Sequence, residues 1–225
     1  MSSAVNTVST TVLKSVPMFA TIPVEQLRTL VPLVMRRSVH RGAVIMREGE
    51  PVDSLYIVLT GRLKVMMGEA DGKEVILSFL GPGEFFGEMG LIDGGARSAS
   101  VIAIEPCELL LVTKRDFKKC LAENFDTAMT VMRVLVRRLR GADRKIGSLA
   151  MLDVYGRVAR LLLDMSETVN GQQVLTRRLP KQDIAKMIGA SREMVSLVMK
   201  DLELSGYIEV RGSTIVLRDT VAPPR

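Results

Sequence analysis

Between Val44 and about Val112 the chain alternates short apolar or mixed runs with turn-forming residues. The four clearest runs are 54–59, 62–66, 75–80 and 98–104, and dipeptides rich in Gly, Pro and Asp separate them. Several short strands at this spacing predict a β-sandwich or barrel with a jelly-roll-like path. Ahead of them, Pro23 to Leu30 has the spacing of a short amphipathic helix, with Pro23 suited to its first turn.

From about Lys114 onward the apolar residues recur with a helical period. They follow alternating steps of four and three, at Ala128, Met132, Leu135, Leu139, Ala142, Ile146 and Leu149. A two-in-seven seam over three repeats is typical of paired helices, whereas a helix that packs on its own domain has a broader apolar stripe. The seam therefore predicts a helix that pairs in parallel with the same helix of a second copy. A core helix within its own domain is the alternative.

The part of the chain that begins at Leu152 has the pattern of a small, mostly helical domain. Asp153 can cap a helix that continues through Met165, and Asn170-Gly171 supplies a turn. Two further helices are expected over 180–188 and 191–205, followed by a hairpin over 207–217. Two helices followed by a β-hairpin describe a winged helix.

These patterns together predict an α+β chain of three parts. The parts are a β jelly roll at 1–123, a coiled-coil dimerisation helix at 124–151 and a winged helix-turn-helix at 152–225.

The segment 180–200 has the packing pattern of a helix-turn-helix. Ala185 is small where a second helix must cross closely, and Gly189 can take the left-handed conformation that the turn needs. Ser191 is placed to cap the second helix. The residues expected in the shared core are Ile184, Ile188, Val195 and Val198. An amphipathic helical pair used for protein contact is the alternative, which this joint spacing and the following hairpin disfavour.

The exposed face of the second helix begins with side chains that match base edges. A recognition helix presents its N-terminal residues to the major groove, where Arg192 can pair with guanine and Glu193 can accept from cytosine N4. Ser196 lies one turn further along, and Lys181 and Lys200 suit contacts with the phosphate backbone. The predicted DNA-binding residues are Lys181, Gln182, Ser191, Arg192, Glu193, Ser196 and Lys200.

A glycine-rich segment, 83–101, has the residues of a phosphate-binding loop. Glycines at 81, 83, 87, 90, 94 and 95 let the backbone approach a ligand closely and point amides at an anion. Arg97 supplies a cation for a phosphate, and the hydroxyl and amide of Ser98 can add to it. Glu88 can accept hydrogen bonds from a sugar hydroxyl. The alternative is a turn-rich corner of the barrel.

The composition argues against catalysis and against a metal site. His40 is the only histidine, so neither a His-based metal site nor a Ser-His-Asp triad can form. Cys107 and Cys120 are the only cysteines and form no CxxC pair, so we expect two reduced thiols. We therefore predict that the chain is not an enzyme.

Charge and hydropathy set the expected compartment and partners. The net charge of +6 and the pI of about 9.5 permit a polyanionic partner such as DNA. The apolar runs are too short to span a bilayer, and the first ten residues lack the features of a secretory signal. We expect a cytoplasmic protein with no membrane partner.

From about Phe19 to Leu217 the chain resembles the family of the cyclic-AMP receptor protein and the fumarate-nitrate regulator. The segments that carry the resemblance are Gly87-Glu88 with Arg97-Ser98-Ala99, Arg137-Arg138-Leu139, Leu149 to Val154 with Gly156-Arg157, and Gly189 to Glu193. The resemblance implies a cyclic-nucleotide-binding jelly roll, a long dimer helix and a winged helix-turn-helix. It also implies a hinge near Leu152-Asp153.

The resemblance also implies roles for residues of the effector site. Glu88 would bind the ribose hydroxyl, and Arg97 and Ser98 would bind the phosphate. Residues of the run 75–80 would line the pocket. The expected effector-binding residues are Leu77, Ser78, Leu80, Gly87, Glu88, Met89, Arg97, Ser98, Ala99, Ala142 and Asp143.

Departures from the family pattern bear on the choice of effector. No cysteine cluster lies near the N-terminus for an iron-sulfur centre, and His40 alone is a poor haem ligand. Ala142-Asp143 stands where the cyclic-AMP branch has a Thr-Ser pair that contacts adenine. A carboxylate instead suits the two donors on the edge of guanine. We expect cyclic di-GMP or cyclic GMP at least as readily as cyclic AMP, unless Asp143 only pairs with Arg140 or Arg144 on the helix surface.

Leu197 is a second departure, because the DNA-reading helix of the family often carries an arginine there. The usual half-site of the family is therefore in doubt at one base pair or more. The expected protein is a homodimer that reads two inverted half-sites of double-stranded DNA about 34 Å apart, with RNA polymerase as a further partner. The alternatives are an effector-independent DNA-binding regulator and a cyclic-nucleotide-binding module that regulates another protein.

Overall fold

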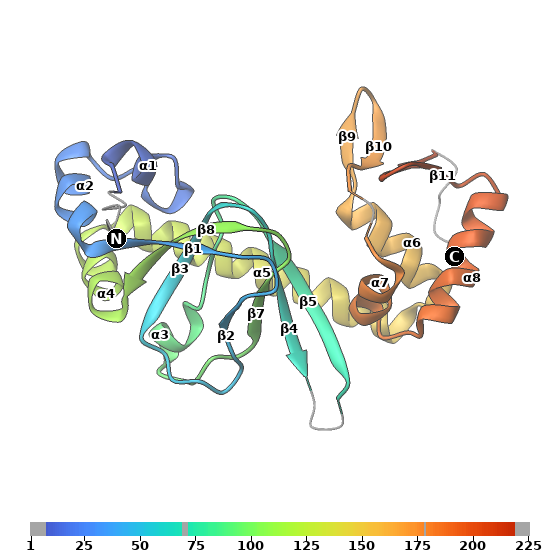
Figure 1. The fold of residues 1–225 in the computed structure, drawn as a ribbon, viewed down its shortest axis with the longest axis horizontal. Coiled ribbons are helices and arrows are strands. Elements are labelled where there is room, and N and C mark those ends of the chain that lie inside the picture. The colour runs from blue at the N-terminus through green and yellow to red at the C-terminus, as the bar shows by residue number, and fades with distance from the viewer. Residues whose placement is uncertain (1–7, 69–71, 178, 219–225) are drawn as a thin grey trace. The chain divides into compact units, whose positions relative to one another are not determined.

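The computed structural model describes residues 8–68, 72–177 and 179–218. The chain divides into two compact units, Met1–Arg137 and Arg138–Arg225, and the division falls within the long helix α5 (Phe125–Met151) (Figure 1). The helix predicted over 124–151 is thus present. No helix among the described residues is both long and apolar enough to cross a bilayer.

The first unit is built on two four-stranded antiparallel sheets. Their orders are β1-β8-β3-β6 and β2-β7-β4-β5. The strands are β1 Val34–Val39, β2 Val44–Met46, β3 Ser54–Thr60, β4 Leu63–Gly68, β5 Glu74–Leu80, β6 Phe85–Phe86, β7 Ser100–Ala103 and β8 Cys107–Thr113. The first strand pairs with the last, the second with the seventh, the third with the sixth and the fourth with the fifth. This nested pairing is that of a jelly roll, as predicted.

Strand β3 lies at the centre of the unit and is buried on both faces. Successive side chains of a strand point to opposite sides of the sheet. Leu55 and Ile57 therefore enter one hydrophobic cluster, while Tyr56 and Val58 enter another. The second cluster fills the space between the two sheets, where Leu63 of β4 joins it. The run 54–59 is continuously apolar because each face of this strand packs against a hydrophobic cluster.

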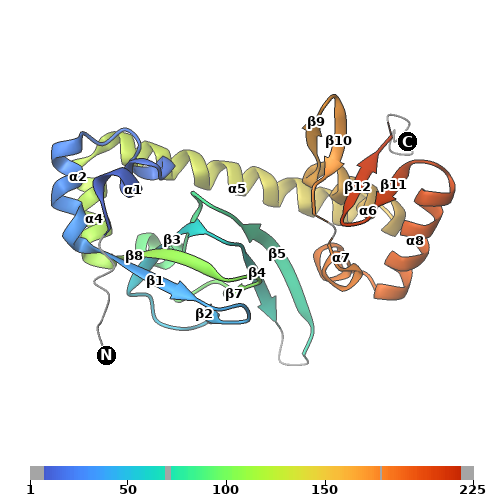
Figure 2. The ribbon, with the colours of Figure 1, turned by 45° about the horizontal axis from the view of Figure 1, so that its top comes forward.

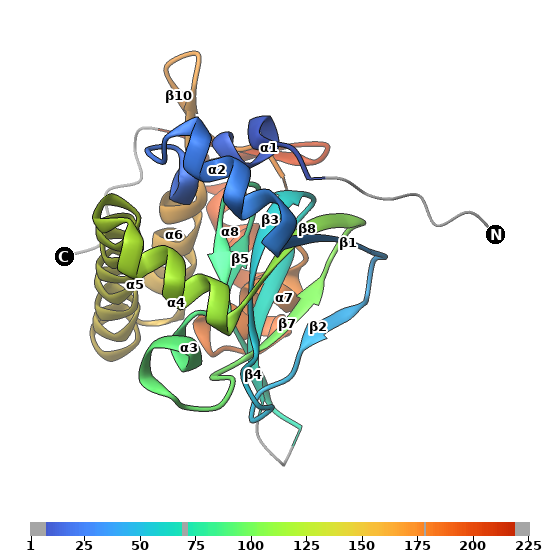
Figure 3. The ribbon, with the colours of Figure 1, turned by 90° about the vertical axis from the view of Figure 1, so that its left-hand side faces the viewer.

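Helices cover the outer face of the sheet that contains β3. They are α1 (Thr10–Lys14), α2 (Val24–Leu30) and α4 (Lys114–Glu123), with two short 3-10 turns at Pro17–Phe19 and Val31–Leu33. Figure 3 shows α1, α2 and α4 beside β3 and β8, and their apolar side chains share a cluster with those strands. The predicted helix at Pro23 is present, but Pro23 occupies its N-cap and the first turn starts at Val24.

The second unit contains a four-stranded antiparallel sheet of order β11-β12-β10-β9 and three helices after α5. These elements are α6 Val154–Met165, β9 Glu167–Val169, β10 Gln172–Leu175, α7 Lys181–Ile188, α8 Arg192–Leu204, β11 Ile208–Arg211 and β12 Thr214–Leu217. Figure 2 shows both hairpins, β9–β10 and β11–β12. The predicted winged helix is confirmed, whereas β9 and β10 were not predicted.

Only the turn of the β9–β10 hairpin was predictable from the sequence, because it contains Asn170-Gly171. Asn170 and Gly171 both have positive φ, at 50° and 79°. This is the backbone of the two-residue turn that Asn-Gly favours. Its flanking strands are three and four residues long, and β9 is exposed throughout. Such short strands carry too little apolar alternation to be recognised.

Arg157 of α6 joins the ends of two other helices in the second unit. Its Nε donates to the carbonyl of Leu152 at 2.9 Å and its Nη2 to that of Leu149 at 2.9 Å. Its Nη1 donates to the carbonyl of Ile188, the last residue of α7, at 3.3 Å. Carbonyls at the end of a helix lack donors within the helix. Arg157 therefore supplies the missing donors for both α5 and α7.

The break between α5 and α6 falls at Leu152-Asp153, where the hinge is expected. Asp153 is the N-cap of α6, and its carboxylate accepts from the backbone N–H of Gly156 at 2.8 Å. A Cβ added at Gly156 would lie 3.2 Å from the Cβ of Leu152. The break is thus tightly packed and held by hydrogen bonds.

Replacing Arg157 by alanine is expected to lower the free energy of unfolding of the second unit by about 1–3 kcal/mol, because carbonyls lose a charged donor. Urea denaturation followed by circular dichroism measures the change. Arg160→Ala is the matched control, since Arg160 only pairs with Asp164 on the exposed face of the same helix and such pairs contribute about 0.3–0.5 kcal/mol. Equal effects of the two substitutions would contradict the role of Arg157.

Candidate functional site

The side chain of Arg97 lies inside the first unit, at the end of the glycine-rich segment. The residue is 6% exposed, and its Nη1 donates to the carbonyl of Gly87 at 2.8 Å. Its backbone is also fixed, because its N–H donates to Glu50 at 2.9 Å and its carbonyl accepts from Gly49 at 2.8 Å. The Gly87 carbonyl therefore holds the guanidinium, and hydrogen bonds with Gly49 and Glu50 hold the backbone of the same residue.

Gly87 makes this position of the guanidinium possible. Its φ is +80°, which side chains disfavour, and an added Cβ would lie 2.4 Å from Nη1 of Arg97 and 2.9 Å from Cε of Met46. Any larger residue would push the guanidinium away. The glycine is needed here for space as well as for backbone conformation.

The other contacts of the Arg97 guanidinium are long. Its Nη2 lies 3.5 Å from Oδ1 of Asp53 and 3.5 Å from Oγ of Ser54. The Asp53 side chain is 88% exposed, so this ion pair contributes little. The guanidinium also lies 5.9 Å from the ring centre of Tyr56, which stacks on Phe86. A guanidinium has five N–H donors, so donor capacity remains for an anion.

Glu88 and Ser98 flank this cation with different exposures. Glu88 is buried and stands at the N-cap of the short helix α3 (Met89–Asp93). Ser98 is exposed, and its hydroxyl donates to Sδ of Met89 at 3.4 Å. A thioether is a weak acceptor, so this hydroxyl can exchange its partner for a phosphate oxygen. Ala99, next in the chain, is buried.

The structure brings together part of the expected effector set. The residues from Gly87 to Met89 and from Arg97 to Ala99 form one neighbourhood through the contacts above. The residues expected on β5 belong to the other sheet: Leu77 and Ser78 are exposed, and Leu80 is buried in the cluster between the sheets.

Ala142 and Asp143 lie on α5 in the second unit, and both are exposed. Within the described part of the chain Asp143 forms no ion pair with Arg140 or Arg144, which was the alternative explanation of this carboxylate. Its carboxylate is therefore available to a ligand.

Four residues around Arg97 and Gly87 were missed from the sequence. Asp53, Ser54 and Tyr56 contact the Arg97 guanidinium, and Met46 lies beside Gly87. All four lie more than forty residues before Arg97 in the chain, and only the pairing of β2 and β3 with their neighbours brings them to this site. No local pattern marks them.

A groove of about 580 Å³ runs along the exposed face of α8 in the second unit. Its lining residues are Lys181, Arg192, Glu193, Ser196, Leu197, Met199, Lys200, Glu203 and Val210. Five of the seven expected DNA-binding residues are among them. The other two, Gln182 and Ser191, are exposed but do not line the groove.

The helix-turn-helix has the local geometry that its sequence predicts. Ser191 is the N-cap of α8, and its hydroxyl accepts from the N–H of Met194 at 3.1 Å. Gly189 ends α7 with φ +65°. One core residue was wrongly predicted: Val198 is only half-buried, and Met199 and Leu202 are buried in its place. The second core position of α8 is thus Met199, one residue later in the chain than expected.

The heptad seam of α5 leaves most of its apolar side chains exposed in a single chain. Leu139 and Ile146 are 62% and 64% exposed, and Met132 and Leu149 are also exposed. Leu135 differs, because it is half-buried against the core of the first unit. The beginning of α5 therefore packs against the core of its own unit, as the alternative of a core helix proposed. The apolar side chains further along the seam remain exposed to solvent in a single chain.

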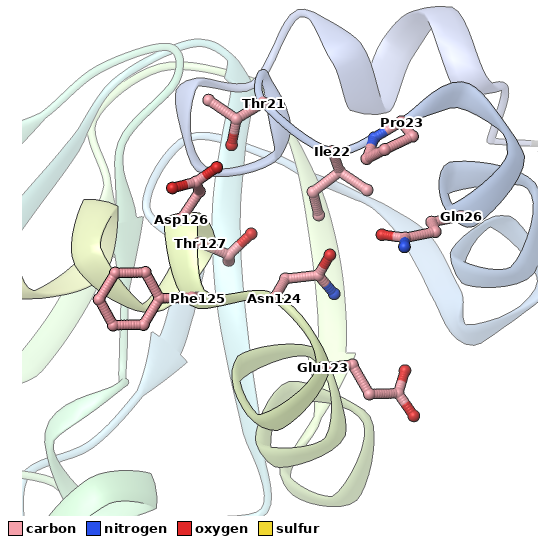
Figure 4. A pocket seen from close by; sticks show the side chains of 9 residues that line it. All are labelled: Thr21, Ile22, Pro23, Gln26, Glu123, Asn124, Phe125, Asp126 and Thr127. Atoms are coloured by element: carbon pink, nitrogen blue, oxygen red, sulfur yellow. The ribbon is translucent and has the colours of Figure 1, made fainter.

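A separate pocket of about 250 Å³ lies in the first unit, where the start of α2 meets the junction of α4 and α5 (Figure 4). Its lining residues are Thr21, Ile22, Pro23, Gln26, Glu123, Asn124, Phe125, Asp126 and Thr127. The buried hydroxyl of Thr127 has no hydrogen-bond partner among the described residues. None of the expected effector or DNA-binding residues lines this pocket.

The two thiols have the environment of structural cysteines. Cys107 and Cys120 are both free and buried. Burial raises the pKa of the Cys107 thiol, and it raises that of Cys120 to about 11. Both thiols are therefore protonated at neutral pH and are poor nucleophiles. The described residues contain no group of three or more His, Cys, Asp or Glu placed to hold a metal ion.

Comparison with known proteins identifies a domain in each part of the chain that contains a candidate site. Residues 36–124 match the cyclic nucleotide-binding domain, and residues 156–222 match the Crp-like helix-turn-helix domain. The cAMP-activated global transcriptional regulator CRP of Pasteurella multocida is 36% identical over 182 residues, which cover 79% of this chain and 87% of that protein. A CRP-like cAMP-activated global transcriptional regulator of Mycobacterium tuberculosis is 32% identical over 184 residues, 80% of this chain and 82% of that protein.

Among solved structures, the c-di-GMP responsive global regulator CLP of Xanthomonas campestris matches with a TM-score of 0.73 and 29% identity. The match covers 88% of this chain and all of that one. The jelly roll with its buried Arg97, the helix-turn-helix groove and these likenesses lead to one conclusion. The chain belongs to the CRP/FNR family of DNA-binding transcription regulators and contains a cyclic-nucleotide-binding domain.

Proposed function

We propose that this regulator is a homodimer whose DNA affinity is controlled by a cyclic nucleotide bound at Arg97. The observation that carries the proposal is the position of the Arg97 guanidinium. It donates to the carbonyl of Gly87, while its remaining donors make only long contacts with the residues that the structure describes. A phosphate oxygen forms shorter, charge-assisted hydrogen bonds with such donors.

The neighbours of Arg97 suit the other parts of a nucleotide. The Ser98 hydroxyl, whose present partner is a thioether, adds a donor to the phosphate. Glu88 accepts from a ribose hydroxyl, because a carboxylate has only acceptors. Leu77, Ser78 and Leu80 are proposed to contact the rest of the ligand.

The proposed base of the effector is guanine, with adenine as the alternative. Asp143 is exposed and has no ion-pair partner in the described part of the chain. Its carboxylate accepts from the N1–H and N2–H₂ donors of guanine, which adenine lacks on that edge. Both effector classes occur among relatives, since the Xanthomonas regulator is described as c-di-GMP responsive and the Pasteurella one as cAMP-activated.

The exposed seam of α5 supports the homodimer. Leu139 and Ile146 leave more than half of their surface exposed in one chain, and a second copy of the same helix would cover them through coiled-coil packing. A two-fold dimer presents two α8 helices to successive major grooves, about 34 Å apart, so the operator is proposed to be an inverted repeat. RNA polymerase is the proposed partner at the promoter.

Effector and DNA binding are proposed to be coupled through α5 and the Leu152-Asp153 break. A coupling of about 1–3 kcal/mol is typical, which corresponds to a change of about five- to 150-fold in operator affinity. Arg157 is proposed to transmit any shift of the end of α5, because it donates to the carbonyl of Leu149 in the last turn of α5 and to that of Ile188 at the end of α7.

Calorimetric titration of the full chain with cyclic AMP, cyclic GMP and cyclic di-GMP tests the choice of effector. A guanine nucleotide is expected to bind, and Asp143→Ala is expected to weaken it by about tenfold or more, because two hydrogen bonds to a charged group are lost. Cyclic AMP serves as the internal control, since its affinity should not change. Equal binding of the guanine nucleotides by both proteins would contradict the role of Asp143. Binding of none of the three would favour an effector-independent regulator.

Replacing Leu139 by glutamate tests the dimer. The substitution places a charge in the seam, and the dimer is expected to dissociate to monomers at micromolar concentration in sedimentation velocity. Leu204→Glu is the control, because Leu204 is similarly exposed at the end of α8 and lies outside the seam. A Leu139→Glu protein that sediments as a dimer would rule out the α5 seam as the interface.

A further inference from the structure

Leu197 stands out on the face of α8 that lines the groove. It is 70% exposed, although most residues around it in the groove are charged or polar. The other apolar residues of the groove, Met199 and Val210, are buried and half-buried and so belong to the packing of the domain. Leu197 instead presents an apolar surface that nothing in the described chain covers.

The position of Leu197 on the helix places it among the base-reading residues. It follows Glu193 by four residues and Ser196 by one, and residues four apart share a face of a helix. Arg192, Glu193 and Ser196 line the same groove. When this face of α8 enters a major groove, Leu197 is brought to the base edges with them.

The chemistry of a leucine restricts what it can recognise in that groove. It has no hydrogen-bond donor or acceptor, and guanine, cytosine and adenine are recognised in the major groove by their donors and acceptors, because none of them carries a methyl group. Thymine also carries a C5-methyl group, which is the apolar feature of the major groove. A polar edge set against Leu197 would lose its water without gaining a partner.

We infer that Leu197 is a specificity-determining residue, which reads the C5-methyl group of one thymine in each operator half-site. The inference rests on the DNA binding proposed for α8 and adds the identity of one base pair. Leu197 selects that thymine by covering its methyl group, while Arg192 and Glu193 select neighbouring bases by hydrogen bonds.

The experiment begins with selection of operators from randomised duplex DNA by the full-length protein, without nucleotide and with each of the three cyclic nucleotides. In the best operator, each thymine is then replaced in turn by deoxyuridine, which removes only the methyl group. Affinities are measured for the unchanged protein and for Leu197→Ala. Leu204→Ala is the control, because it removes an equally exposed leucine of α8 from outside the groove.

At one thymine of each half-site, deoxyuridine is expected to weaken binding by the unchanged protein about fourfold, the effect of one buried methyl group. Leu197→Ala should show no such difference at that position, while Leu204→Ala should keep it. When cytosine replaces that thymine, methylation of the cytosine at C5 should strengthen binding by the unchanged protein and have no effect on binding by Leu197→Ala.

Two results would overturn the inference, and they are distinguishable. If an operator is recovered but every deoxyuridine has the same effect on the unchanged protein and on Leu197→Ala, the assignment of Leu197 fails and DNA binding stands. If no sequence is recovered under any of the four conditions, the proposed DNA-binding function itself fails.

Discussion

The contact between the Arg97 guanidinium and the Gly87 carbonyl joins the glycine-rich loop to the interior of the jelly roll. Gly87 cannot be replaced by a larger residue, because an added Cβ would overlap the guanidinium and also reach Met46 on β2. Tyr56 on β3 and Phe86 on β6 stack beside it. Residues of three strands therefore surround the contact between the buried cation and the loop. Among the described residues, the remaining donors of the cation meet only an exposed carboxylate and a hydroxyl at 3.5 Å, so an anionic ligand can bind without breaking the 2.8 Å contact that positions it.

Features that depend on neighbouring residues were predictable from the sequence. The N-caps Asp153 and Ser191, the left-handed Gly189 and the turn at Asn170-Gly171 follow from local backbone chemistry, and all have the expected geometry. Features that depend on distant pairing were not. Met46 reaches Gly87, and Tyr56 reaches Arg97, only because β2 and β3 lie beside strands far along the chain. Val198 was wrongly assigned to the core because Val198 and Met199 both follow Val195 at helical spacing, by three and by four residues. A period of 3.6 residues does not decide between them over a helix as short as α8.

The second unit separates the residues that hold it together from those that face outward. Arg157 satisfies the terminal carbonyls of α5 and α7, and Val195, Met199 and Leu202 pack α8 on its neighbours. Arg192, Glu193 and Leu197 are left exposed and play no part in that packing. The face proposed to read bases can therefore vary without loss of the fold. This separation explains how Leu197 can lie exposed in the groove without disturbing the packing of the domain.

The central claim is that an anion bound at Arg97 controls DNA affinity, and Gly87→Ala tests it most directly. Operator affinity is measured by fluorescence anisotropy with and without each cyclic nucleotide. Gly42→Ala is the control, because Gly42 has the same kind of positive φ, +84°, but open space around its Cβ position. The account predicts a five- to 150-fold response in the unchanged protein and in Gly42→Ala, and none in Gly87→Ala, whose nucleotide-free DNA binding stays normal. A full response in Gly87→Ala would contradict it.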